Sequence, residues 1–463
     1  MMIFYNKELL MKKKSNYLTG SIGKTMFKTA LAMLPGTIAV SGYNLADTYF
    51  VSQLGTIPLA AMGFTFPVVM ILGCIFHGMG VGVMANVAHA VGGQKISKAA
   101  KLVTSGMILV VLVAAVLGII GFFTMDWTFR QFGAEGEVCK PISEYMNIWY
   151  LGCLTGAVTM VGNSLLVAVG DSRLAGLFMM TGLITNIVLD PLFIFEWGFG
   201  MGIAGAALAT ILSQLLGCVL ITTALGKRHK LWDFRHLDFR VVRPAWKSII
   251  RFAIPSMLGM ILMPAGNGVI TRIVASFGDA AVAATAAAGR LEVVAFMLPM
   301  SLGIGLTPMI AQNYGAKQYS RIIGCRKFAM TFALWYLLLM AVVYFIAAPY
   351  LVKFFTQDPA VEEIMINYLR IVPWGLAFIE IHRYSGFFFT GCNYPRGSAW
   401  LAALRIIVLL IPLSLLALWF GNLNGLFVAR LLADVIAGSI AWRLVIRMNG
   451  TLPADGETVY RKK

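Results

Sequence analysis

Charged residues are scarce in this sequence, and acidic residues are the scarcest. Only 12% of the 463 residues are Asp, Glu, Lys or Arg, and 59% are apolar. A soluble domain carries roughly 25% charged residues. The composition therefore excludes an ordinary soluble domain and indicates a chain surrounded by lipid. Any acid inside a long apolar run then needs a partner, water or a function to keep it there.

Cysteine is also sparse, and no two cysteines are spaced as metal ligands. The six cysteines show no CxxC pair and are scattered over residues 74, 139, 153, 218, 325 and 392. We therefore expect neither a disulfide framework nor a zinc site. No ATPase motif, haem-ligand pair or hydrolase triad occurs either. The sequence predicts no enzyme, no catalytic residue, no bound metal and no cofactor.

Long apolar runs dominate the rest of the chain. A membrane-spanning helix needs about 20 mostly apolar residues. Twelve such runs occur, at residues 26–54, 58–91, 99–124, 141–169, 174–196, 201–226, 245–276, 281–313, 323–350, 362–390, 398–420 and 424–446. They are too continuously apolar for barrel strands, whose residues alternate, and lipid leaves helices as the other spanning structure. The sequence predicts an all-α integral membrane protein with twelve transmembrane helices.

The basic residues lie almost entirely on one side of these runs. With a cytoplasmic N-terminus, the inner segments hold 28 Lys and Arg residues, whereas the outer loops hold only Arg130, Lys140 and Lys353. The positive-inside rule then places both termini in the cytoplasm and the protein in the cell (inner) membrane. This distribution accounts for most of the +17 net charge. We therefore expect no nucleic-acid partner, and expect membrane lipids and a small organic substrate instead.

The N-terminal stretch MMIFYNKELLMKKKSNYLTG has no apolar core after its lysines and no small-residue cleavage site. We therefore expect no signal peptide. The chain is expected to start at either Met1 or Met11.

The sequence repeats itself at a nearly constant spacing. GMGVGVMANVAHAVGGQ (78–94) aligns with SLGIGLTPMIAQNYGAK (301–317), and three glycines coincide at a spacing of 223 residues. The same spacing pairs Tyr145 with Tyr368, and it becomes 220 near the end of each copy. Each copy holds six predicted helices, and an even number returns the chain to the same side. The copies are therefore expected to be related by a pseudo-two-fold axis along the membrane normal.

This repeat predicts two six-helix bundles joined by a basic linker. The expected segments are a cytoplasmic N-terminal segment (1–23), a first bundle (24–226), a cytoplasmic linker (227–244), a second bundle (245–446) and a cytoplasmic tail (447–463). Two facing bundles suggest a central cavity and alternating access. We expect a monomer.

Short motifs at the helix ends carry a family resemblance. The first half contains NLADTYFVSQLG, VGGQ, VAVGDSR, TNIVLDPLFIF and GIAGAALAT, and the second half contains the weaker AAAGRLE and TGCNYPR. With these motifs the chain resembles the multidrug and toxic compound extrusion (MATE) family over nearly its whole length. The resemblance implies twelve helices in two bundles. It also implies export of organic, often cationic, compounds driven by inward flow of Na⁺ or H⁺.

Polar residues in three predicted helices of the first half lie at one depth. Asp47 precedes the end of the first helix by eight residues, and Thr210 lies eight residues into the sixth. Asn186 and Asp190 are four residues apart on one face of the fifth. At 1.5 Å per residue, these side chains lie roughly 10–12 Å from the outer helix ends. We expect them to form one cluster.

The resemblance implies that this cluster is the cation or proton site. Two nearby carboxylates cannot both ionise cheaply. The pair can take up a proton, or Na⁺ can neutralise it with Asn and Thr oxygens completing the shell. The alternative is that the two acids only cap or cross-link helix ends.

The second half does not repeat this cluster. The 220-residue spacing puts Asn267 at the position of Asp47 and Arg430 at that of Thr210, and the 223-residue spacing puts leucines at the other two. Coupling is therefore expected in the first bundle.

A possible secondary site lies in the tenth predicted helix. Glu380 stands there beside His382 and Arg383, and some members of the family place coupling acids in the second bundle. Alternatively, Glu380 pairs with a cation such as Arg383 or Arg405. Glu292, in AAAGRLE, matches a family motif and is expected to be structural.

Three other functions agree less well with the sequence. A flippase or exporter of lipid-linked or polysaccharide precursors belongs to the same broader superfamily, but such proteins often have extra helices and a strongly basic cavity. An ion channel is compatible with the duplication, yet no pore-loop sequence is present. A membrane scaffold that transports nothing leaves the intramembrane acids unexplained.

Overall fold

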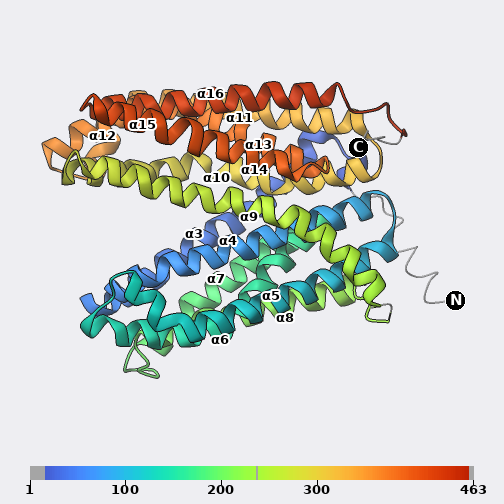
Figure 1. Ribbon diagram of the computed structural model, residues 1–463, viewed down its shortest axis with the longest axis horizontal. Helices are drawn as coiled ribbons and strands as arrows, with labels where there is room; N and C mark the ends of the chain where they lie inside the picture. Colours follow the sequence, from blue (N-terminus) through green and yellow to red (C-terminus); the bar gives the residue numbers. More distant parts are fainter. Residues whose placement is uncertain (1–15, 236–237, 458–463) are drawn as a thin grey trace. The chain divides into compact units, whose positions relative to one another are not determined.

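The computed structural model describes residues 16–235 and 238–457 (Figure 1). Expectations for residues 1–15, including a start at Met11, and for residues 236–237 and 458–463 lie outside this part. Within it the regular structure is helical, with no strand. The six cysteines are all free, as their spacing predicts.

From residue 16 onward, the described part of the first half forms one short helix and six long ones. These are α2 (Asn16–Thr19), α3 (Ile22–Ser52), α4 (Thr56–Gly92), α5 (Ile96–Gln131), α6 (Cys139–Ala168), α7 (Ser172–Ile194) and α8 (Ile203–Thr223). A 3₁₀ turn, η1 (Gly136–Val138), precedes α6, and a π-helical segment, η2 (Ala224–Arg228), extends α8.

The second half begins with three unbroken helices, α9 (Phe239–Ala275), α10 (Asp279–Gly315) and α11 (Tyr319–Leu351), the last extended by η3 (Val352–Phe354). The next span consists of α12 (Pro359–Ile371), η4 (Val372–Gly375) and α13 (Leu376–Gly391). The following one consists of α14 (Pro395–Ala403), the π-helical η5 (Leu404–Leu410) and α15 (Ile411–Trp419), and α16 (Leu423–Asn449) is last.

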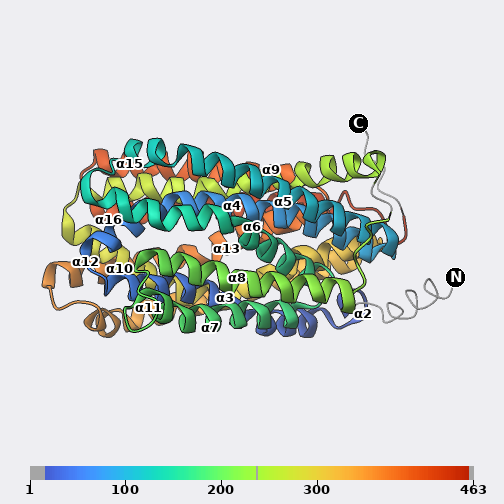
Figure 2. The ribbon, with the colours of Figure 1, turned by 90° about the horizontal axis from the view of Figure 1, so that it is seen from below.

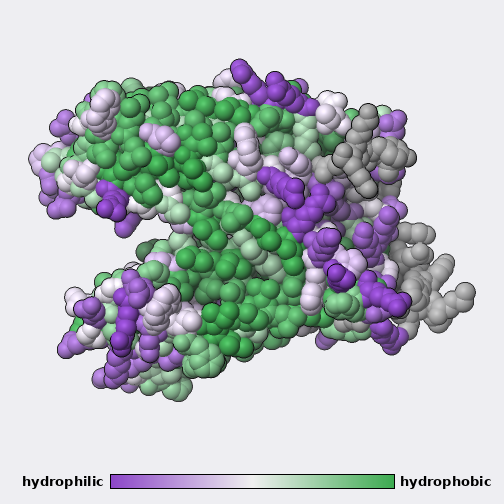
Figure 3. Space-filling model, viewed as in Figure 1, coloured by the Kyte–Doolittle hydropathy of each residue, from purple (hydrophilic) through white to green (hydrophobic). Residues whose placement is uncertain are grey.

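These helices confirm the predicted fold class. In the described part, eleven helices are long and apolar enough to cross a membrane. α3 is not among them, but its 31 residues exceed the roughly 20 that a span needs. On the face shown in Figure 3, hydrophobic residues cover the middle of the helices and hydrophilic residues gather near their ends. Large apolar side chains such as Phe123, Trp335 and Leu339 are exposed on the surface of the described chain, where lipid is expected.

The duplication extends to the backbone of the turns. Three pairs of residues, each 223 positions apart, adopt the same left-handed conformation: Gly55 with Gly278, Gln94 with Lys317, and Gly170 with Asn393. The last two pairs include residues other than glycine, which seldom adopt a positive φ. Positive φ values at equivalent positions are consistent with a duplication of the turns between the helices.

The described chain forms two compact units, and two helices take part in both. One unit contains residues 31–257, and the other contains residues 17–30 and 258–457. α3 and α9 therefore each begin in one unit and continue in the other, whereas the predicted bundles at 24–226 and 245–446 keep each helix whole.

Side-chain contacts hold the first part of α9 and the short helix α2, which precedes α3. Within the first unit, Trp246 Nε1 of α9 donates to the Ser105 carbonyl at 2.8 Å, and Ser248 Oγ donates to Asn86 Oδ1. Within the second unit, Asn313 Nδ2 donates to the Tyr17 carbonyl at 3.0 Å. Packing of this kind leaves no signal in hydropathy.

Two local features bring the polar residues of the first unit together. A Cβ on Gly176 of α7 would lie 2.1 Å from the Ala32 carbonyl oxygen, so the absence of a side chain lets α3 approach α7 closely. The turn after α7 contains Gly200 and Gly202 at φ values of 62° and 58°. This turn sends α8 back along α7, and the two helices run side by side (Figure 2).

Candidate functional site

Four polar side chains form one connected cluster inside the first unit. Asn186 Nδ2 donates to Asp190 Oδ1 at 3.1 Å and to Thr210 Oγ1 at 3.4 Å. Thr210 Oγ1 donates in turn to Asp47 Oδ2 at 3.4 Å. All four residues are buried. The structure therefore brings together, from α3, α7 and α8, the residues that the depth count places at one level. We call them the Asp47 cluster.

The cluster has more acceptors than donors. Asp47 Oδ1, Asn186 Oδ1 and Asp190 Oδ2 are buried, with no hydrogen-bond partner among the described residues. The carboxyl groups of Asp47 and Asp190 are also close enough to interact directly. A buried polar atom without a partner costs about 1–3 kcal/mol. This set of carboxylate, amide and hydroxyl oxygens fits a bound proton or a small hard cation.

Three further polar residues support the cluster, and the sequence analysis did not include them. Ser213 Oγ donates to the Thr210 carbonyl at 2.8 Å and lies 2.8 Å from Tyr43 OH. Tyr145 of α6 is buried within electrostatic range of both carboxyl groups. Helical spacing could have found two of them, because Tyr43 precedes Asp47 by one turn and Ser213 follows Thr210 by three residues.

A second polar group of the first unit lies outside the spans. Asp171, in the turn before α7, accepts from Arg228 Nη2 at 2.9 Å and lies 3.3 Å from His229 Nε2. Its contacts with His229 and then Arg228 hold the pKa of Asp171 below its usual value. These contacts fix the beginning of the linker to the turn between α6 and α7.

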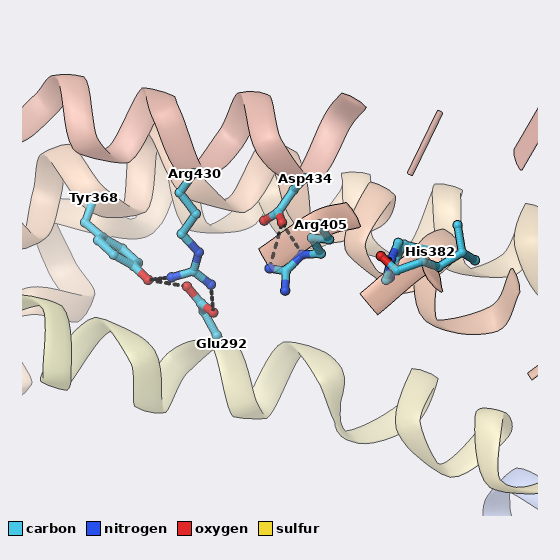
Figure 4. A network of polar contacts seen from close by, with 7 residues as sticks. Glu292, Tyr368, His382, Arg405, Arg430 and Asp434 are labelled. Atoms are coloured by element: carbon cyan, nitrogen blue, oxygen red, sulfur yellow. Dashed lines mark hydrogen bonds and ion pairs between the residues drawn. The ribbon is translucent and has the colours of Figure 1, made fainter. Parts of the chain in front are cut away.

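The second unit contains two ion pairs whose acids, Glu292 and Asp434, are buried (Figure 4). Arg430 Nη2 of α16 lies 2.6 Å from Glu292 Oε2 of α10, and Tyr368 OH of α12 contacts both side chains. Arg405 Nε of η5 donates to Asp434 Oδ1 of α16 at 2.7 Å. These pairs join the second, fourth, fifth and sixth spans of the unit.

The residues of the possible secondary site do not form one cluster. Glu380 and Arg383 contact each other, and His382 contacts a different part of the unit. Glu380 is fully buried and forms an ion pair with Arg383, one of the two arginines considered for it. The Arg383 guanidinium also lies 5.0 Å from the centre of the Phe296 ring. His382 Nε2 is instead 2.9 Å from the Leu401 carbonyl. Within the described part, no group of three or more His, Cys, Asp or Glu side chains is arranged to hold a metal ion.

Comparison with known proteins decides the family. A family model described as MatE matches residues 33–192 and 255–416. The chain belongs to the MATE family. The same model matches each half once, in agreement with the predicted duplication. The protein is therefore a multi-pass membrane transporter, in a family of transporters rather than enzymes.

Individual relatives match nearly end to end. A FAD transporter of Shewanella oneidensis is 31% identical over 442 residues, which are 95% of this chain and 97% of that protein. The multidrug export protein MepA of Staphylococcus aureus is 25% identical over 93% of this chain and 95% of its own. Among solved structures, the MATE transporter VcmN of Vibrio cholerae in its bent form has a TM-score of 0.88 at 29% identity, covering 93% of this chain and 98% of that one.

Proposed function

We propose that this protein is a cation-coupled antiporter that exports organic compounds by alternating access while H⁺ or Na⁺ enters. The observation that carries the proposal is the Asp47 cluster, which brings together two carboxyl groups from two membrane-spanning helices and leaves three of its buried oxygens without a hydrogen-bond partner. Carboxylates in such a place are expensive unless a cation or proton neutralises them. A site that carries less negative charge when loaded than when empty gives the transporter two states of different energy.

Coupling follows from that difference. The loaded site costs little free energy in an apolar bundle. The empty site instead favours a conformation in which water or another partner reaches the acids. An ion gradient that loads the site from one side and empties it to the other then drives the cycle in one direction. The coupling ion and the exported compound bind to the same two alternating conformations of the transporter. Ion flow down its gradient can therefore drive the compound out against its own gradient.

The ion pairs of the second unit favour this function over export of lipid-linked precursors. Arg383, Arg405 and Arg430 are each paired with an acid. Paired guanidinium groups do not supply the strongly basic lining that a large anionic substrate would favour. The relatives' names give two compounds to test first. A cationic dye, as a multidrug substrate, fits this arrangement of arginines, whereas FAD is a large anion whose transport would contradict this argument.

Location and orientation complete the proposal. The positive-inside pattern places the protein in the cell (inner) membrane with both termini in the cytoplasm. The proposal is of a monomer, and all four residues of the Asp47 cluster come from one chain.

Transport in vesicles tests the proposal. Purified protein is reconstituted, and movement of FAD or a cationic dye is followed under a Na⁺ gradient at equal pH and under a pH gradient at equal Na⁺. One gradient should drive transport, and Asp47→Asn and Asp190→Asn should each abolish it, since they keep shape and remove charge. Glu380→Gln is the matched control and should retain coupling. Gradient-driven transport by both Asp variants, together with its loss in Glu380→Gln, would move the coupling site to the second unit.

A further inference from the structure

Two positions of the repeat carry polar side chains at a buried acid in both units. Tyr145 and Tyr368 are 223 residues apart, and Thr210 and Arg430 are 220 apart. In the first unit, Tyr145 lies in the field of both carboxyl groups of the Asp47 cluster, and Thr210 donates to one of them. In the second unit, Tyr368 OH donates to a buried carboxylate, and Arg430 forms an ion pair with it.

The acid sites of the two units differ in the helix that supplies the carboxyl group and in the positive charge beside it. In the second unit the carboxylate is Glu292 of α10, and the equivalent of Asp47 is Asn267, which is exposed on α9. A guanidinium group stands where the first unit has only a threonine hydroxyl. The positive charge is thus part of the chain in one unit and must come from solution in the other.

We propose that Arg430 is a built-in substitute for the coupling cation: its guanidinium neutralises Glu292 permanently, so the second unit binds no ion and each chain couples through one site. This inference rests on the proposed function, because it sets the number of ions per cycle for the same transporter. Glu292 then acts as a positioning residue, and Arg430 determines stoichiometry.

The surroundings of Glu292 are suited to a cation once Arg430 is shortened. Arg430→Thr would reproduce the first-unit residue and leave Glu292 with the Tyr368 hydroxyl. The nearest other acid is Asp434, whose charge remains paired with Arg405. Tyr344 donates to the Leu291 carbonyl and keeps that bond. A buried carboxylate without its counter-charge is expected to recruit Na⁺ or a proton.

Ion binding by purified protein tests this directly. Binding of ²²Na⁺ at pH 8 and thermal unfolding in NaCl against choline chloride at equal ionic strength are measured in an Asp47→Asn background. If the transporter couples to protons, the same unfolding measurement is made at pH 8 and pH 5.5. Asp47→Asn alone should show no ion response. Asp47→Asn/Arg430→Thr should regain about one bound ion per chain, and adding Glu292→Gln should remove it again.

Two results would overturn the inference. One is an Asp47→Asn/Arg430→Thr protein that unfolds cooperatively yet responds to neither Na⁺ nor pH. The other is loss of ion binding in Glu292→Gln with Arg430 intact, which would mean that the second unit already binds an ion. Should Arg430→Thr not survive purification, Arg430→Ala prepared with millimolar methylguanidinium replaces it. Methylguanidinium should then raise the unfolding temperature of Arg430→Ala but not that of Arg430→Ala/Glu292→Gln. An equal rise in both variants would also contradict the proposal.

Failure of the proposed function would look different. It would appear as an unchanged ion response in Asp47→Asn with Arg430 in place. In that case the ion response of Asp47→Asn can still be compared with that of Asp47→Asn/Arg430→Thr. The difference between these two proteins reports only on ion binding in the second unit.

Discussion

Thr210 Oγ1 donates a hydrogen bond to Asp47 Oδ2 at 3.4 Å although the two residues are 163 positions apart. The bond joins the first and sixth spans of the repeat, and Asn186 joins the same hydroxyl to the fifth. A neutral hydroxyl thus contacts the Asp47 carboxyl and, through Asn186, is linked to that of Asp190. It can support a bound cation from its lone pairs or donate to a charged acid after the cation leaves.

Thr210→Val should therefore weaken ion binding without abolishing transport. A single long, neutral hydrogen bond is worth about 0.5–1.5 kcal/mol, so the half-saturating ion concentration should rise roughly 2–10-fold. Ion-dependent dye transport in vesicles measures this. Thr222→Val is the matched control, because Thr222 lies on the same helix and its hydroxyl bonds only to carbonyls of that helix. A larger loss in Thr222→Val than in Thr210→Val would contradict the assignment.

The Arg405–Asp434 pair should matter more for stability than for coupling. Arg405 and Asp434 are both buried, and breaking a buried pair by removing one partner costs about 3–5 kcal/mol. Arg405→Ala should lower the unfolding temperature in detergent markedly. Arg405→Met/Asp434→Leu should recover much of the loss, since no uncompensated charge remains. A double variant as unstable as the single one would show that the cost comes from lost packing.

The contact between Asp171 and the linker predicts a pH dependence. His229 and Arg228 lower the native pKa of Asp171, so its contribution to stability is complete above the unfolded pKa of about 3.9 and is lost as the pH falls through the lower native value. Asp171→Asn should cost about 1 kcal/mol or less at pH 7, because the Arg228 side chain is 63% exposed. The difference from wild type should be present from pH 5 to 8 and should shrink below about pH 4, as the Asp171 carboxylate is protonated. A difference that instead grows on acidification would reverse the sign and refute this account.

The orientation can be tested with single cysteines. In a Cys139→Ser background, Lys230→Cys should resist an impermeant thiol reagent in intact cells, whereas Glu135→Cys should react. Both positions are exposed side chains of loops on opposite sides of the predicted spans. Reaction at position 230 but not at position 135 would invert the predicted topology.

The sequence predicts the spans and the Asp47 cluster because both depend on periodic signals. Apolar runs mark helices, and counting residues from the helix ends places Asp47, Asn186, Asp190 and Thr210 at one depth. The Glu292–Arg430 pair had no such signal. Its members are 138 residues apart, and the second unit takes its acid from a different helix from those that supply the first. A constant repeat spacing identifies equivalent positions. It does not show which neighbouring helix supplies the residue of opposite charge.

The sharing of α3 and α9 between the two units has a consequence for biogenesis. Asn313 holds the backbone of Tyr17 from 296 residues further along the chain. During synthesis, α2, which precedes α3, can therefore gain this partner only after α10 is made, and the first unit is complete only when the first half of α9 has followed it. The second unit is built from two separate stretches of the described chain, 17–30 and 258–457, so its first stretch is made long before the rest of the unit.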